Sequence, residues 1–167
     1  MIKIYATLRL IIFNMYKVAS LIFVFFSLLL PLEYPHLTFA ELKIEKARVN
    51  DYRIQLLNRI NQYRQDKGLN SLILDPCLNK VAQGHSGWMY ATGTFSHTGK
   101  NRSLPKQRCA DAGCVCDTET IFFSADMTGQ KCFESWLRSP EHNDIMLGSH
   151  TKIGIGIANG YVTAVYD

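Results

Sequence analysis

The chain has 167 residues, with 18 Lys and Arg against 14 Asp and Glu, and a formal net charge of +4. This length fits one globular domain with an appended segment. The first 40 residues hold three of the basic residues and one acid, so the remainder carries 15 basic and 13 acidic side chains. A nearly balanced charge gives no support to a nucleic-acid partner.

The N-terminal segment has the pattern of a secretory signal peptide. An apolar run covers residues 18–32, three basic residues precede it, and a small-residue site follows at residues 38–40. We therefore expect residues 1–40 to be a signal peptide, with Met15 as an alternative start, and residues 41–167 to form the mature domain. An uncleaved anchor is the other interpretation, and it is the only membrane contact that we expect. The domain is expected to be secreted or periplasmic.

Two amphipathic helices are predicted at the start of the mature domain. Apolar residues recur every three or four positions over residues 47–67, and Gly68 ends this helix. Asp75 and Pro76 open the second helix, as a capping carboxylate followed by proline at the first helical position. The predicted buried face of this second helix consists of Leu78, Val81, Ala82, His85, Trp88 and Met89. On such a face His85 is expected to be a core histidine rather than a ligand.

The middle of the chain is polar and basic, and it shows no periodicity. We expect a long loop over residues 98–118, and a short helix or strand that carries Glu119 over residues 117–124. Thr128 is expected to cap a further helix that ends near Pro140. The predicted apolar face of that helix consists of Cys132, Phe133, Trp136 and Leu137.

Two strands are predicted to close the chain. Three isoleucines alternate with glycine over residues 153–157. An Asn-Gly pair at residues 159–160 then turns the chain into residues 161–166, as in a β-hairpin. Helices and strands together predict one α+β domain without internal repeats.

The mature domain contains five cysteines: Cys77, Cys109, Cys114, Cys116 and Cys132. An exported domain would form at most two disulfides and leave one thiol, and the pairing stays open. Three of the cysteines lie in the polar loop, so a bond inside it, or from it to Cys132, would fix a segment with little core of its own. A four-thiolate zinc site from Cys109, Cys114, Cys116 and Cys132 is the alternative, although its spacing lacks the paired C-x2-C of zinc ribbons.

Several fragments follow one another in an order known from a protein family. They are residues 57–64 (LNRINQYR), Gly68 and Leu69, Leu78, residues 95–97 (FSH), 119–122 (ETIF), 136–142 (WLRSPEH) and 153–157 (IGIGI). In this order they resemble the CAP superfamily (cysteine-rich secretory proteins, antigen 5, pathogenesis-related 1), particularly its compact bacterial branch. The likeness runs from Asp51 to Tyr166. It implies an α-β-α sandwich, in which helices flank a small, mostly antiparallel sheet.

The resemblance also implies a cleft with two histidines and two glutamates, which holds a divalent cation in some members. His97 and Glu119 match the first histidine and the first glutamate. Ser139 stands where the second glutamate is expected, and residues 160–163 (GYVT) lack the second histidine. His142 matches a histidine of the S-P-x-H motif of the bacterial branch.

The candidate site therefore consists of His97, Glu119 and His142. A carboxylate beside an imidazole raises its basicity and fixes its tautomer, and two imidazoles with one carboxylate can bind zinc. With an open fourth position such a site could activate water. The alternative is a buried hydrogen-bond network that joins the loop, the helix end and the sheet. A zinc ion is the only cofactor that the sequence raises.

The incomplete set of cleft residues favours a binding module over an enzyme. We expect a secreted CAP-domain protein that binds a lipid, an envelope glycan or a protein outside the cytoplasm. The alternative is a metal-dependent hydrolase that uses His97 and His142 as ligands and Glu119 as ligand or general base. A purely structural role in the envelope is a third hypothesis.

Overall fold

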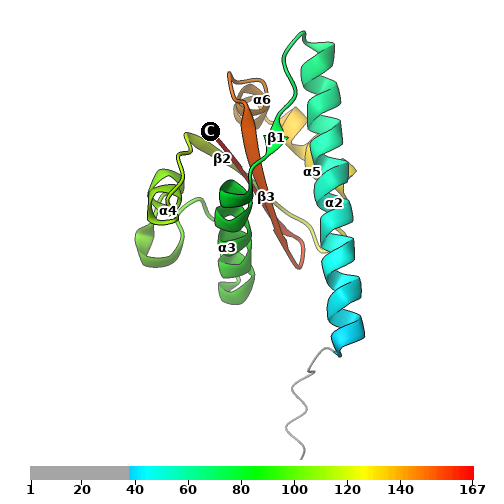
Figure 1. Ribbon diagram of the computed structural model, residues 1–167, viewed down its shortest axis with the longest axis vertical. Coiled ribbons are helices and arrows are strands. Elements are labelled where there is room, and N and C mark those ends of the chain that lie inside the picture. The colour runs from blue at the N-terminus through cyan, green and yellow to red at the C-terminus, as the bar shows by residue number, and fades with distance from the viewer. Residues whose placement is uncertain (1–37) are drawn as a thin grey trace, which may run out of the picture. The chain divides into compact units, whose positions relative to one another are not determined.

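The computed structural model describes residues 38–167, and its compact unit spans Glu41–Asp167. The predicted signal peptide lies outside the described residues except for residues 38–40. The helices are α2 (Phe39–Asp66), α3 (Pro76–Thr92), η1 (Lys100–Arg102), α4 (Pro105–Asp111), α5 (Gly129–Arg138) and α6 (Pro140–Met146). The strands are β1 (Ile73–Leu74), β2 (Thr118–Phe123), β3 (Lys152–Ala158) and β4 (Tyr161–Tyr166) (Figure 1). No helix within residues 38–167 combines the length and the apolar character needed to cross a bilayer.

The four strands form one mixed sheet in the order β1-β3-β4-β2. The short β1 pairs in parallel with β3, whereas β3 with β4 and β4 with β2 are antiparallel. The predicted hairpin is present, since β3 and β4 are joined by Asn159 and Gly160, both at positive φ. Figure 1 shows α2 and α3 on opposite sides of β3. The expected α+β fold, with helices flanking a small and mostly antiparallel sheet, is confirmed.

Strand β3 separates two hydrophobic cores. Its isoleucines lie in one cluster with residues of α2 and α5, among them Ile60 and Trp136. Its glycines lie against α3 instead, because a Cβ added at Gly154 would come within 2.0 Å of the backbone of Leu78, and one at Gly156 within 2.1 Å of the backbone of Ala82. The alternation of Ile and Gly thus lets α3 lie directly on the backbone of the sheet.

Arg64, near the end of α2, connects this helix to the segment that follows it and to the end of α6. Its side chain is buried, and burial lowers the pKa of the guanidinium. It donates hydrogen bonds of 2.7–3.1 Å to four backbone carbonyls, which belong to Asn70, Met146, Gly148 and His150. These carbonyls lie at the end of a helix or in irregular segments, where no backbone N–H of a helix or strand donates to them. The guanidinium of Arg64 supplies the missing donors.

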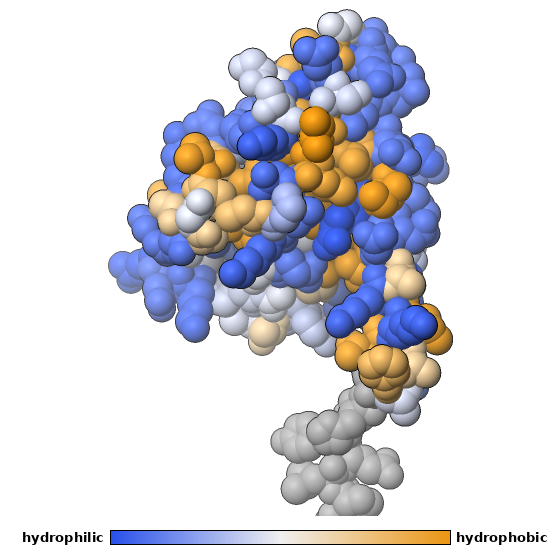
Figure 2. Space-filling model, viewed as in Figure 1, coloured by the Kyte–Doolittle hydropathy of each residue, from blue (hydrophilic) through white to orange (hydrophobic). Residues whose placement is uncertain are grey.

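Helix α2 begins at Phe39 rather than at residue 47. Its first two turns include Phe39 and Ile44, which are 85% and 66% exposed, and Figure 2 shows apolar side chains at this end of the helix. These turns lack a buried stripe, so hydrophobic periodicity does not reveal them. Their Ala, Glu and Lys residues are nevertheless strong helix formers.

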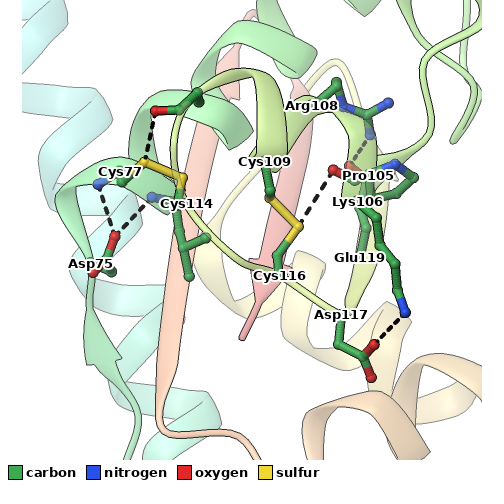
Figure 3. The surroundings of a disulfide bond; sticks show 12 residues. Asp75, Cys77, Pro105, Lys106, Arg108, Cys109, Cys114, Cys116, Asp117 and Glu119 are labelled. Atoms are coloured by element: carbon green, nitrogen blue, oxygen red, sulfur yellow. Dashed lines mark hydrogen bonds and ion pairs between the residues drawn. A yellow bond between two sulfur atoms is a disulfide. The ribbon is translucent and has the colours of Figure 1, made fainter.

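The prediction of a loop over residues 98–118 was wrong, since this segment contains η1 and α4. Helix α4 has seven residues, too few to show a period, and Pro105 occupies its first turn. Two disulfides support it, Cys77–Cys114 and Cys109–Cys116, and Figure 3 shows both. The four-thiolate zinc site was therefore also wrong. Cys132 is the remaining thiol and is fully buried in the core.

A helix after residue 139 was also missed. Ser139 ends α5, and its hydroxyl caps α6 by accepting from the backbone N–H of His142. Pro140 then takes the first position of α6, where it needs no hydrogen-bond acceptor. The Ser-Pro pair thus ends α5 and begins α6. Leu137 is 38% exposed and does not belong to the buried face of α5.

Gly156→Ala is expected to destabilise the domain. The added methyl group would overlap the backbone of Ala82, and overpacking of this kind costs about 1–3 kcal/mol. Chemical denaturation followed by circular dichroism measures the loss. The control is Gly87→Ala in α3, where a Cβ meets nothing within 4 Å, so the variant should gain about 0.5–1 kcal/mol from helix propensity. Equal stability of Gly156→Ala and wild type would contradict the close packing of α3 on β3.

Candidate functional site

Glu119 lies at the centre of the candidate site, near the start of β2. Its side chain is only 1% exposed. One carboxylate oxygen, Oε1, accepts from His97 Nδ1 at 2.9 Å, and the other, Oε2, accepts from Arg108 Nη2 at 2.5 Å. A buried carboxylate requires partners of this kind, because removing its hydration costs several kcal/mol, about as much as a strong ion pair returns. Both oxygens of Glu119 are thus committed to neighbouring donors.

Arg108 extends this interaction to the loop before α4. Its Nη1 donates to the carbonyl oxygens of His97 at 3.1 Å and Ser103 at 2.8 Å. The next residue, Cys109, is buried and bonded to Cys116, which places α4 against the sheet next to β2 (Figure 3). The two disulfides therefore position the guanidinium that holds Glu119.

His85 of α3 lies beneath the same carboxylate. Its Nε2 donates to the carbonyl oxygen of Ser96 at 2.9 Å and lies 3.7 Å from Glu119 Oε1. Burial lowers the pKa of His85, which keeps the ring neutral at pH 7. Its ring also stacks on Trp88, with centroids 5.6 Å apart and planes 9° apart. The prediction that His85 lies in the core is confirmed, since its side chain is buried.

His142 approaches the site from the first turns of α6. Its ring centroid lies 6.4 Å from that of His97 and 6.4 Å from that of Trp136. Partial burial, and to a smaller degree the nearby His97, lower the pKa of His142. Within the described residues the His142 ring makes these aromatic contacts and no side-chain hydrogen bond, so its nitrogens are available to a ligand.

His97, Glu119 and His142 line one cleft of about 440 Å³. Lys106 and Asp117 contribute an ion pair of 2.7 Å to its rim. The remaining lining residues are Leu104, Pro105, Thr118, Glu141 and Ile145. The structure thus brings the three candidate residues together. His97 comes from the loop after α3, Glu119 from β2 and His142 from α6.

The three side chains are not grouped as metal ligands in this arrangement. His97 Nδ1 and both oxygens of Glu119 already serve the hydrogen-bond network, and the two histidine rings lie 6.4 Å apart. Among residues 38–167 no three side chains of His, Cys, Asp or Glu are grouped so that they could hold a metal. Zinc binding by His97, Glu119 and His142 stays a prediction, and no reaction step is derived through it.

Ser139, at the position of the expected second glutamate, and Thr163, in the stretch that lacks the second histidine, have structural contacts of their own. Ser139 caps α6, as described above. Thr163 on β4 lies 2.9 Å from the hydroxyl of Ser86, which also contacts the carbonyl oxygen of Gly156 at 3.0 Å. These contacts join α3 to β3 and β4.

Arg108 and His85 were not identified as partners of Glu119 from the sequence. Arg108 lies in a segment that reads as a loop, and His85 lies on a stripe that reads as core. Neither position has a spacing that links it to Glu119. A buried acid in a strand does require a cation nearby, and Arg108 is the basic residue next to a disulfide cysteine, which is the signal that could have found it.

Glu119→Ala is expected to lower the free energy of unfolding by about 3–5 kcal/mol, the usual cost of leaving a buried ionic partner alone. The reason is that Arg108 would lose its carboxylate while it stays largely buried. Denaturant titration measures this loss. The matched control is Glu45→Ala, whose partner Arg48 is exposed on α2, and exposed pairs contribute at most about 1 kcal/mol. A similar small change in both variants would refute the central role of Glu119.

Stability is expected to fall as the pH drops below 6.5, the ordinary pKa of histidine. Because burial lowers the pKa of His85 in the folded state, the unfolded chain binds a proton more readily, and protons favour unfolding. The contribution is complete above pH 6.5 and is lost toward the lowered pKa. His85→Gln retains a donor for the carbonyl of Ser96 and cannot titrate. Its free energy of unfolding should depend less steeply on pH between about 7 and 5 than that of wild type, and an unchanged slope would exclude His85 as the cause.

The chain was compared with known proteins. The sequence model of the cysteine-rich secretory protein family (CAP) matches residues 57–166. An extracellular protein with an SCP domain from Bacillus anthracis superposes with a TM-score of 0.68 at 23% identity, over 78% of this chain and 43% of that chain. An outer surface protein from Borrelia burgdorferi gives 0.60 at 21% identity, over 70% of this chain and 92% of that one. A cysteine-rich secretory protein from Staphylococcus aureus gives 0.59 at 18% identity, over 70% and 38%.

The chain thus spans less than half the length of the structures from Bacillus anthracis and Staphylococcus aureus. No curated protein matches it. At these identities the superpositions show the fold, and the match of the family model covers well over half of the sequence. Fold, motif order and family match agree with the resemblance noted from the sequence, and the chain belongs to the cysteine-rich secretory protein (CAP) family.

Proposed function

We propose that this protein is an exported binding module, which holds a ligand outside the cytoplasm in the cleft of His97, Glu119 and His142 without catalysing a reaction. The commitment of both Glu119 oxygens to His97 and Arg108 carries this proposal. Each carboxylate oxygen keeps a second lone pair, but a general base must also reach the proton that it removes, and the Glu119 side chain is only 1% exposed. A carboxylate that is buried and doubly hydrogen-bonded serves instead to fix the wall of the cleft.

Export is supported by the chemistry of the cysteines and by the N-terminal sequence. Two disulfides persist in oxidising compartments and are rare in the cytosol. The apolar run of residues 18–32 has the composition of a signal peptide. Two of the similar structures are named as an extracellular protein and an outer surface protein.

The cleft combines polar and apolar surface. The rings of His97 and His142 and the Lys106–Asp117 pair supply hydrogen-bonding groups, while Leu104 and Ile145 are apolar. Its volume of about 440 Å³ falls in the range of small-molecule sites. A lipid headgroup, a glycan of the envelope or a loop of another protein all present such mixed surfaces.

Binding is expected to depend on His142. The test uses exported full-length protein with phosphatidylglycerol vesicles and with purified peptidoglycan, followed by co-sedimentation, together with chromogenic ester and peptide substrates. Wild type should bind one of the two surfaces and turn over neither substrate. His142→Ala should weaken the binding about tenfold, since it removes one hydrogen-bonding side chain from the cleft.

The matched control is Asp144→Ala, which changes an exposed residue on the same helix. It should bind as wild type does. Turnover that disappears in His142→Ala would show an enzyme and overturn the proposal. Binding that is equally strong in His142→Ala would show that the ligand does not occupy this cleft.

A further inference from the structure

A second groove lies beside α3, separate from the cleft of His142. It measures about 840 Å³ and runs between α3 and the segment from η1 to α4. The loop that contains Gly99 and Ser103, held by Arg108, divides it from the cleft. On the face seen in Figure 2, hydrophilic side chains predominate around η1 and α4, with small apolar areas between them. Leu104 is the one residue that lines both spaces.

Positive charge is concentrated along this groove. Lys80, Lys100 and Arg102 line it, are exposed, and form no ion pair within the described residues. Asp111 is the single carboxylate among the lining residues. Since the mature domain is close to neutral, this local excess of cations is a property of the groove and favours an anionic ligand.

Two buried polar atoms beside the groove have no hydrogen-bond partner. Within the described residues three buried side-chain atoms are unpartnered, and two of them, His85 Nδ1 and Arg108 Nε, belong to residues that line this groove. His85 Nε2 carries the proton, because it donates to the carbonyl of Ser96, so Nδ1 is an acceptor. Arg108 Nε is a donor. A hydroxyl group both donates and accepts, so it matches the chemistry of either atom.

Gly99 packs closely against both residues. A Cβ at this position would lie 3.0 Å from His85 Nδ1 and 3.1 Å from Arg108 Nη1. The backbone of Gly99 has φ −97° and ψ −159°, an extended conformation that any residue adopts. Glycine is therefore favoured here by space and not by backbone geometry. Both unpartnered atoms stay buried behind the surface of the groove.

Trp88 supplies a flat apolar surface in the same groove. Its indole lies parallel to the ring of His85 and is partly exposed. An indole face packs well against the C–H face of a sugar ring, and its N–H is a further donor. Exposed cations beside an aromatic platform suit a ligand that carries both negative charge and a sugar ring. A polyphosphate would use the cations but not the platform, and a neutral glycan would use the platform but not the cations.

We propose that the groove between α3 and α4 binds an acidic glycan. A sugar ring lies on Trp88, and the carboxylates face Lys80, Lys100 and Arg102. This site is distinct from the cleft of the proposed function, so either can fail without the other.

The test is isothermal titration of the exported full-length protein with hexagalacturonate, an oligomer of uronic acids. Maltohexaose is the neutral control of the same length, and linear polyphosphate is the anionic control without hydroxyl groups. Wild type should bind hexagalacturonate at least about tenfold more tightly than either control, a difference that one or two charged hydrogen bonds supply. Tryptophan fluorescence should change on binding, since Trp88 lines the groove and Trp136 is fully buried.

Gly99→Ala should weaken hexagalacturonate binding about tenfold, because the added methyl group presses on the ring of His85, on which Trp88 stacks, and a displaced indole loses its contact with the sugar. Gly87→Ala, with open space around its Cβ, is the control and should bind normally. Lys80→Ala with Lys100→Ala changes exposed residues only and should weaken binding even if Gly99→Ala folds poorly. His142→Ala should leave binding to hexagalacturonate unchanged, which separates this site from the cleft.

Three results would overturn the proposal. The first is no binding of hexagalacturonate by wild type up to about 1 mM, a concentration at which even weak sites respond. The second is equal affinity for polyphosphate, which would show an attraction of charges without a sugar site. The third is wild-type affinity in the Lys80 and Lys100 double variant.

Discussion

The carboxylate of Glu119 is the point at which three separate segments of the chain meet. Strand β2 supplies the acid, α4 supplies Arg108, and the chain after α3 supplies His97. A charge buried to this extent is stable only where its partners are fixed in advance. The geometry of the cleft and of the groove beside α3 therefore depends on how firmly these partners are held.

The disulfides provide that firmness for Arg108. Helix α4 has only seven residues and buries little beyond Cys109, so its own packing would not hold it. Cys77–Cys114 joins the end of α4 to the first turn of α3, and Cys109–Cys116 joins α4 to the start of β2. Loops closed in this way lose conformational freedom in the unfolded chain, which favours the folded arrangement. The covalent bonds thus act on the site through one guanidinium.

The sequence predicted the parts of this molecule whose patterns are long or marked by strong local signals. The stripe of α2, the Asp-Pro start of α3 and the Ile-Gly alternation of β3 were all identified correctly, because burial imposes these periods directly. Helix α4 and helix α6 were missed, since seven residues are too few for a period. For α4 the stabilising contacts are disulfides whose pairing the spacing of Cys114 and Cys116 does not reveal.

The sequence predicted that His97, Glu119 and His142 lie together, but not which residues connect them. The resemblance to the family located His97, Glu119 and His142, and they do line one cleft. The sequence could not show that Arg108 shares the carboxylate with His97, because that contact depends on a helix that the pattern does not reveal. It also could not show the unpartnered nitrogen of His85, which is buried close to Gly99.

The unpaired cysteine, Cys132, has a consequence for the order in which the domain folds. Cys132 lies in the core with no exposed surface, and burial raises the pKa of its thiol, so the reactive thiolate is suppressed in the finished domain. During oxidative folding, however, all five sulfurs compete as long as α5 is undocked. Correct pairing is therefore secured when the apolar contacts around Trp136 close over Cys132 before the last disulfide forms. In this domain the hydrophobic core shields the Cys132 thiol from exchange with the disulfides.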